Sequence, residues 1–274
     1  RRRLPLGTVP DLRLPVSLVS FAIFSTLVLA GLFGSRDPLS NPLPLTVWTL
    51  LWVGLTFVQG LFGNAWYWLN PWYGPYRLAK SVSGSTDDGE APRMLPGGVG
   101  YWPAFILFFA FAWFELIDPA PDDPYRLALA AGLYWLVAFA AMLAFGFEKW
   151  SRQGEFLSAF FAMISRFGMV EGRAQGNSIK LGLCWPGAQL ADAQPLPVSG
   201  ALFLLLTLAS VSFDGFSRTF FWFGLIGVNP LEHPGRSALM GVNSLGLLAM
   251  FLALAGVGLA AILAGERLVR SRLP

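Results

Sequence analysis

The stretch "FAWFELIDPAPDDPYRLALAAGLYW", residues 111–135, sets four acidic side chains between two strongly apolar runs. The runs are continuously apolar rather than alternating, which favours membrane-spanning helices over the strands of a membrane barrel. Three prolines between the runs prevent a single helix from continuing through the acids. The stretch therefore predicts two membrane helices joined by a tight, polar hairpin.

The composition extends this prediction to the whole chain. Hydrophobic residues make up 55% of the 274 residues and charged residues only 13%, which is too apolar for one soluble core. Six runs approach the length of about 20 residues that crosses a bilayer as a helix. They cover residues 15–34, 44–63, 101–118, 127–146, 199–216 and 238–263. We expect an all-α membrane protein that forms a single helical membrane domain over residues 1–274.

The basic residues predict the orientation of the chain. All of its 19 Lys and Arg residues except Arg36, Arg126, Arg218 and Arg236 fall on one side if both termini share that side, which should be cytoplasmic. Residues 64–100 then form a cytoplasmic loop, and residues 147–198 a second cytoplasmic segment. The bases are spread over four segments, so they indicate membrane topology and not nucleic-acid binding. The basic lead before the first run resembles a signal peptide, but the length of that run favours a retained helix.

The second cytoplasmic segment begins with "FEKWSRQGEFLSAFFAMISRFG", residues 147–168. Phenylalanine and isoleucine side chains recur there at helical spacing between polar residues, and the run is too interrupted to span a membrane. This pattern is typical of an interfacial amphipathic helix. The stretch "GRAQGNSIKLGL" after it predicts a small excursion built around a hairpin.

The reactive side chains are few. One Cys and one His exclude an internal disulfide and a zinc site of the usual Cys or His type. A hard cation could bind the acids of the opening stretch, Glu115, Asp118, Asp122 and Asp123. The simpler interpretation is a solvated hairpin, and we assign no metal site.

Two carboxylates fall inside the apolar runs, where an ionisable group suggests a function. Glu115 could pair with Arg126 across the hairpin, and Asp214 precedes Arg218 by the four residues that suit an ion pair on a helix. Either carboxylate could instead carry a proton or face a substrate. We expect the pairings, and keep Glu115 and Asp214 as the candidate catalytic residues.

Aromatic residues are densest in "FGNAWYWLNPWYGPYRLAK", residues 62–80, after the second run. Rings with polar tips gather at membrane interfaces, so a belt that anchors the boundary is the simplest explanation. A groove for a flat ligand or a lipid is the alternative, with Asn64, Asn70 and Trp72 as its candidate residues. The last run carries Ala249, Ala253, Gly256 and Ala260 on one stripe, which would let another helix approach closely.

Four segments, in order over most of the chain, resemble the bacterial membrane proteins known as fenitrothion hydrolase-like. They are "GNAWYWLNPW", "YWPAFILFFAFAWFELIDPAP", "FGFEKWSRQGEFLSAFFAMISRFG" and "LASVSFDGF". The resemblance implies a helical bundle in the bacterial inner membrane and, nominally, organophosphate hydrolysis. It marks Asn70, Pro71, Trp72, Glu115, Glu148, Glu155 and Asp214. Gln153 stands where the family usually has His, and the paired histidines of longer members are not in this sequence.

Two classes of function follow from these observations. The small-residue stripe, the aromatic belts and the few polar residues of the runs favour a non-catalytic helical component that packs with, or helps to assemble, other membrane protein subunits. Phosphotriester hydrolysis usually needs a metal-activated water, and the histidines that would bind the metal are missing from this sequence. The alternative is an organophosphate hydrolase-like enzyme or a small-molecule permease that uses Glu115 and Asp214. The sequence identifies no cofactor, and the lipid bilayer is the one partner that composition itself indicates.

Overall fold

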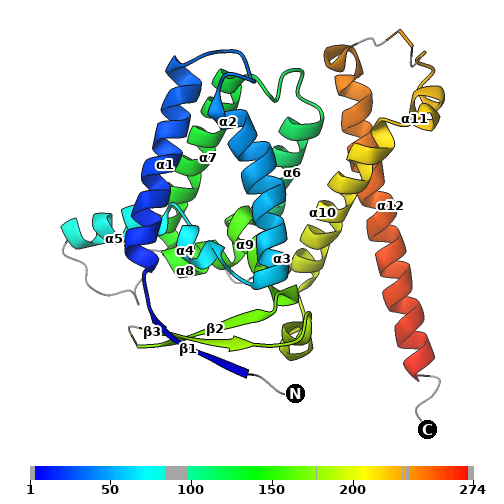
Figure 1. Ribbon diagram of the computed structural model, residues 1–274. Coiled ribbons are helices and arrows are strands. Elements are labelled where there is room, and N and C mark those ends of the chain that lie inside the picture. Colours follow the sequence, from blue (N-terminus) through cyan, green and yellow to red (C-terminus); the bar gives the residue numbers. More distant parts are fainter. Residues whose placement is uncertain (1–3, 84–97, 177, 230, 233–234, 271–274) are drawn as a thin grey trace. The chain divides into compact units, whose positions relative to one another are not determined.

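The computed structural model describes residues 4–83, 98–176, 178–229, 231–232 and 235–270, most of them in helices (Figure 1). The chain divides into two compact units, where the sequence suggested one domain. Unit 1 comprises Arg1–Val99 and Asp122–Pro195, and unit 2 comprises Gly100–Pro121 and Leu196–Pro274. The N-terminal bases Arg1, Arg2 and Arg3, which we expect on the cytoplasmic side, and the single histidine, His233, lie outside the described residues.

Five helical segments of the described chain are long and apolar enough to cross a membrane. They are α1 (Arg13–Phe33), the continuous segment Pro42–Phe62, α7 (Pro124–Phe145), α10 (Val198–Ser217) and the Arg236–Gly265 part of α12 (Arg236–Arg270). The segment Pro42–Phe62 consists of α2 (Pro42–Pro44), the π-helix η1 (Leu45–Leu55) and α3 (Thr56–Phe62). The prediction of an all-α membrane protein is confirmed.

The third expected run forms a shorter helix, α6 (Trp102–Leu116), of 15 residues. Its end follows from the sequence, because Pro119 and Pro121 come three and five positions after Leu116 and cannot continue a helix. At about 1.5 Å per residue, α6 is shorter than the about 30 Å of a bilayer core. The expected six spans are thus five long helices and one short apolar helix.

Unit 1 is built around the packing of α1 on α7 (Figure 1). Gly31 makes the close approach possible, since a Cβ on this residue would lie 2.6 Å from Ala128 Cβ and 2.7 Å from the Pro124 carbonyl oxygen. Four shorter helices fill the unit: α4 (Trp66–Leu69), α5 (Tyr73–Val82), α8 (Phe147–Gln153) and α9 (Phe156–Ile164). The expected 64–100 loop therefore contains α4 and α5, and its residues 84–97 lie outside the described part of the chain.

A three-stranded antiparallel sheet crosses one end of α1 and α3 within unit 1 (Figure 1). Strands β2 (Val170–Gln175) and β3 (Ser178–Leu183) are the expected hairpin, which confirms that prediction. The other neighbour of β3 is β1 (Leu4–Pro10), in the order β1-β3-β2. The sequence had suggested only a basic lead there, because a short strand with proline near each end carries little local signal.

The segment 147–168 differs from the single amphipathic helix that the sequence suggested. It breaks after Gly154, because the backbone of Glu155 is extended (φ −91°, ψ 116°), so α8 and α9 are separate helices. A Cβ at position 154 would lie 2.5 Å from the Trp150 ring, so only glycine fits there. Seven of the nine residues of α9 are buried: Phe156, Leu157, Ser158, Ala159, Phe160, Phe161 and Met163. A helix that is apolar on all sides belongs in a core, and α9 packs against α3, α4 and α8. It continues into the 3₁₀ turn η2 (Ser165–Phe167), and a second such turn, η3 (Ala188–Asp192), follows the sheet.

Unit 2 is organised around α10, which packs against α6, α12 and the short helix α11 (Phe220–Leu225). On α12, Gly258 faces the Leu205 side chain, and Gly246 lies so close to the Phe213 and Trp222 rings that a Cβ there would be 2.6 Å from each. These two glycines mark the face of α12 that packs inside the unit. The stripe of Ala249, Ala253, Gly256 and Ala260 lies on another face and is exposed.

Candidate functional site

The core of unit 1 holds a connected set of buried polar groups, which we call the core network. It consists of Ser17 on α1, Asn70 between α4 and α5, Tyr134 on α7, and Glu155 and Ser158 at the start of α9. Residues far apart in the sequence thus share one hydrogen-bonded system. Polar groups buried in a membrane protein need such partners, because no water replaces them.

Asn70 sits at the turn that Pro71 imposes after α4, and it uses three groups in the core network. Its carbonyl oxygen accepts a hydrogen bond from Ser17 Oγ at 2.5 Å, and its Oδ1 accepts one from the Trp72 backbone N–H at 3.0 Å. Its Nδ2 donates to Ser158 Oγ at 3.0 Å. Ser17 Oγ in turn accepts from the Gly74 N–H at 2.7 Å, so the α4–α5 turn is fixed to α1 and α9.

Glu155 is fully buried and caps the N-terminus of α9. Its Oε1 accepts from the Leu157 N–H at 2.8 Å, and its Oε2 accepts from the Ser158 N–H at 2.7 Å. The Tyr134 hydroxyl also donates to Oε1. These donors, together with the positive end of the helix dipole, offset much of the cost of burying a carboxylate.

Glu155 also reaches deep into the bundle. Tyr134 lies near the middle of the membrane-spanning α7, so its hydroxyl binds the carboxylate well inside the length of that helix. The sequence interpretation missed this, because it placed residues 147–168 at the membrane surface and considered only Glu115 and Asp214 as carboxylates inside the membrane. The run Phe156–Ile164, in which Ser158 is the one polar residue, was the signal for a buried helix.

The starts of α1, α4, α5 and α8 meet around the guanidinium of Arg13. Arg13 Cζ lies 3.9 Å from the centre of the Tyr73 ring, 4.3 Å from that of Tyr67 and 5.0 Å from that of Phe147. Arg13 Nη1 donates to Glu148 Oε1 at 2.9 Å. Burial raises the pKa of the Tyr67 hydroxyl, against the opposing effect of the Arg13 charge. The contacts fix the start of α1 by cation–π attraction.

Unit 2 brings the two carboxylates of the sequence analysis together. Asp214 Oδ1 accepts from Arg218 at 2.8 Å and 3.1 Å, which confirms that pairing. Glu115 interacts electrostatically with Asp214, Arg218 and Arg236. Arg236 Nη2 donates at 3.0 Å to the carbonyl oxygens of both Glu115 and Leu116. The expected pair of Glu115 and Arg126 would join the two units and stays a prediction.

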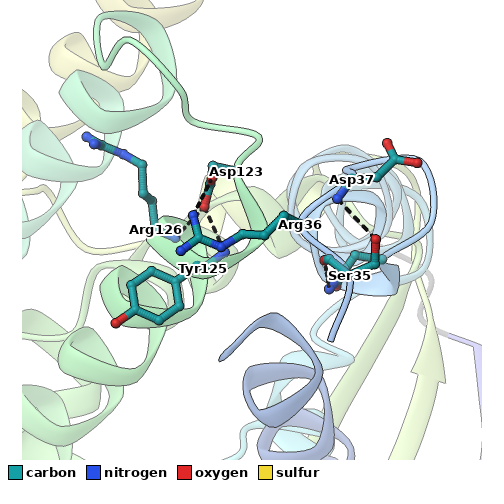
Figure 2. A network of polar contacts seen from close by, with 7 residues as sticks. Ser35, Arg36, Asp37, Asp123, Tyr125 and Arg126 are labelled. Carbon is teal, nitrogen blue, oxygen red and sulfur yellow. Dashed lines mark hydrogen bonds and ion pairs between the residues drawn. The ribbon is translucent and has the colours of Figure 1, made fainter. Parts of the chain in front are cut away.

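The acidic hairpin of the opening stretch serves as a helix cap in the structure (Figure 2). Asp123 Oδ1 accepts from the backbone N–H groups of Tyr125 and Arg126, and Oδ2 accepts from Arg36 at 3.2 Å. The hydrogen bond from the Arg126 N–H, with help from the Arg36 charge, holds the pKa of the Asp123 carboxyl below its ordinary value. Among the described residues, no group of three or more His, Cys, Asp or Glu side chains could hold a metal ion.

The pKa of the nearby Asp37 is lowered too, chiefly by the hydrogen bond from the Ser40 hydroxyl. Figure 2 shows Asp37 on the loop that carries Arg36 toward Asp123. The contacts of Asp123 thus begin α7 and hold Arg36, while those of Asp37 lie within the loop after α1.

The three candidate residues for a ligand or lipid divide between two places. Asn70 and Trp72 are buried, and Trp72 Nε1 donates to the Trp135 carbonyl oxygen at 3.0 Å, so both belong to the core of unit 1. Asn64 lines a half-open cleft of about 280 Å³ between the end of α3, the start of α4 and the sheet. The cleft is lined by Phe62, Gly63, Asn64, Ala65, Tyr67, Trp68, Val170, Gly172, Ile179 and Leu181.

The fold and these sites define the class of the protein, which is a helical membrane protein with several spans. Comparison of the chain with protein-family models, with curated proteins and with solved structures gave no match. The residues that the resemblance marks divide between the units: Asn70, Pro71, Trp72, Glu148 and Glu155 lie in unit 1, and Glu115 and Asp214 lie in unit 2.

Proposed function

We propose that the protein is a non-catalytic helical component of the bacterial inner membrane that packs with other membrane protein subunits. The exposed stripe of Ala249, Ala253, Gly256 and Ala260 on α12 carries this proposal. Small residues let helix backbones approach closely in a membrane, where van der Waals contact drives association. A Cβ on Gly256 would meet no heavy atom of the described chain within 4 Å, so the stripe has room for a second helix.

The packed face of α12 supports this use of small residues. Inside unit 2, Gly246 and Gly258 seat α12 against α10 and α11 through direct contact with Phe213, Trp222 and Leu205. We infer that the stripe does the same for a transmembrane helix of another subunit. The core network supports a structural role as well. The side chains of Asn70 and Glu155 form hydrogen bonds to other groups of the same chain, so these bonds stabilise the fold.

Substitution of Gly256 by Leu tests the proposal, because the added side chain would separate two backbones that otherwise touch. Co-purification in mild detergent should show a partner subunit with the unaltered protein and much less of it with Gly256→Leu. Gly265→Leu is the matched control, since Gly265 is also an exposed glycine of α12 but lies on another side of the helix. Equal recovery of the partner with both variants would contradict the proposal.

We further propose that both termini lie on the cytoplasmic side of the inner membrane, as the distribution of bases indicates. Single cysteines at positions 77, 149 and 122, in a Cys184→Ser background, would test this orientation. Position 122 should react with an impermeant thiol reagent in intact cells, and positions 77 and 149 only after the membrane is disrupted. The reverse pattern would invert the proposed topology.

The second candidate, a hydrolase-like enzyme or a permease, rests on one observation. Unit 2 places Glu115 within electrostatic reach of Asp214, Arg218 and Arg236, which is a charged cluster at the end of apolar helices. Turnover of a chromogenic nitrophenyl phosphotriester by the purified protein would test it. We expect Glu115→Gln to leave function and assembly largely intact. Normal assembly with complete loss of function would place the second candidate first, because Gln cannot exchange a proton there.

A further inference from the structure

The cleft beside Asn64 lies where a membrane-spanning segment ends. Phe62 and Gly63 form the end of the segment Pro42–Phe62, and Ala65 and Trp68 continue the wall into α4. Phe62 is 56% exposed and also lines the cleft, so its ring joins the apolar surface of the span to the cleft wall. The cleft therefore lies at the end of the apolar surface of this segment.

The opposite wall of the cleft is one face of the sheet. Val170 and Gly172 on β2, and Ile179 and Leu181 on β3, alternate with residues of the other face, and Gly172 pairs with Leu181 across the strands. The other face carries Glu171, Arg173 and Lys180, of which Arg173 and Glu171 form an ion pair. The sheet is thus apolar toward the span and charged on its far side, as at a membrane boundary.

The polar side chains of the lining are bound within the chain. Asn64 Oδ1 accepts from the Tyr67 backbone N–H at 3.1 Å, and the Tyr67 hydroxyl donates to Asp11 Oδ2 at 3.0 Å. The ring of Tyr67 also lies under Arg13, at 4.3 Å. This end of the cleft is therefore polar, with the Arg13 charge balanced by Glu148 and Asp11, while the walls from Phe62 to Leu181 offer hydrocarbon contact.

We propose that the cleft binds the acyl chain of a membrane phospholipid, with the polar head at the end formed by Asn64 and Tyr67. The cleft volume of about 280 Å³ is near the lower end of the usual range for ligand sites, and suits part of one chain. Most of the lining is apolar, Phe62 joins it to the end of a span, and Asn64 and Tyr67 form its polar end. The proposal does not depend on the proposed function, because α12 takes no part in the cleft.

Two glycines of the sheet provide a matched pair of variants. Gly172 faces the cleft, where a Cβ would lie 3.3 Å from Ile179 Cγ2, so Gly172→Leu should fill the space. Gly182 lies on the opposite face, with only the Leu4 carbonyl oxygen near, at 3.7 Å, so Gly182→Leu places the same side chain outside the cleft. Ala65→Leu would fill the cleft from the helical wall and does not alter the sheet.

The experiment uses the full chain in phosphatidylethanolamine vesicles that contain a phosphatidylethanolamine with a photoreactive diazirine in one acyl chain. Mass spectrometry should find the adduct on residues 62–68 or 170–181. The overpacking in Gly172→Leu and Ala65→Leu should lower this adduct by about tenfold, while Gly182→Leu keeps it. Melting temperatures would identify any variant that fails to fold.

Unchanged labelling of the cleft in a folded Gly172→Leu or Ala65→Leu variant would overturn the proposal. Adducts confined to the exposed surfaces of the spans would overturn it as well. A diazirine fatty acid serves as the second probe, and labelling of the cleft by the fatty acid but not by the phospholipid would assign the site to free fatty acids instead.

Discussion

Glu155 in unit 1 and Asp214 in unit 2 are both carboxylates in apolar sequence, yet they differ in burial and in hydrogen-bond partners. Glu155 is fully buried and accepts hydrogen bonds from two backbone N–H groups and from Tyr134. The Asp214 side chain is 45% exposed and pairs with Arg218, which is 74% exposed. One carboxylate holds a core together, and the other forms a local pair at the end of a helix.

The comparison shows that a carboxylate in an apolar sequence is not defined by its neighbours in the chain. Asp214 finds its partner four residues away, on the same helix. Glu155 needs Tyr134 from another helix and, through Ser158, Asn70 from a third segment. Its contribution to stability should therefore be larger, and the following changes test that difference from the largest expected effect to the smallest.

Glu155→Ala should lower the free energy of unfolding by about 3 kcal/mol or more, because it leaves the Tyr134 hydroxyl and two backbone N–H groups without an acceptor. Denaturant titration in detergent, followed by far-UV circular dichroism, would measure the loss. Glu155→Gln is the control, since its amide oxygen can still accept hydrogen bonds and should recover part of the stability. An Ala variant as stable as the unaltered protein would contradict the larger contribution of Glu155 to stability.

Ser158→Ala should cost about 2 kcal/mol, because Ser158 Oγ accepts from both Trp66 Nε1 and Asn70 Nδ2 at 3.0 Å. Ser210→Ala in unit 2 is the matched control, since Ser210 is equally buried but donates only to the Thr207 carbonyl oxygen on its own helix. The same titration should show a loss below about 1 kcal/mol for that control. Equal losses would mean that the core network adds nothing beyond local bonds.

Asp123→Asn should cost about 0.5–1 kcal/mol at neutral pH, since it removes the charge that faces Arg36 and the N-terminus of α7 but keeps a capping side chain. The pKa of Asp123 is lowered in the folded state, so its charge stabilises the protein above the unfolded pKa of about 3.9 and ceases to do so as pH falls through the folded value. Melting temperatures of the two proteins should therefore converge below about pH 4. A constant difference down to the lowest pH would contradict this assignment.

Asp214→Asn should have the smallest effect, at most about 0.5 kcal/mol, because exposed i, i+4 ion pairs contribute little and are screened by salt. Melting at low and high ionic strength would measure it, and the small difference should vanish in salt. A loss as large as that of Glu155→Ala would show that Asp214 has a role beyond its pair with Arg218.

Local sequence was sufficient for the membrane class and for the long helices of the fold. Continuous apolar length predicts α1, α7, α10 and the Arg236–Gly265 part of α12 within three residues, because a helix in hydrocarbon must satisfy its own backbone and depends little on its neighbours. The β2–β3 hairpin and the Asp214–Arg218 pair were also predictable, because turn residues and helical spacing act between residues only a few positions apart.

The tertiary structure alone decided which polar residues are buried together. Asn70 and Ser158 are 88 positions apart, and Ser17 and Asn70 are 53 apart, so no local pattern joins them. The tertiary structure also moved Asn70 and Trp72 from an expected interface to the core, and joined β1 to a hairpin more than 160 residues later. Hydropathy reports how well each segment tolerates hydrocarbon, whereas the burial of Glu155 depends on donors that only the packed helices bring to it.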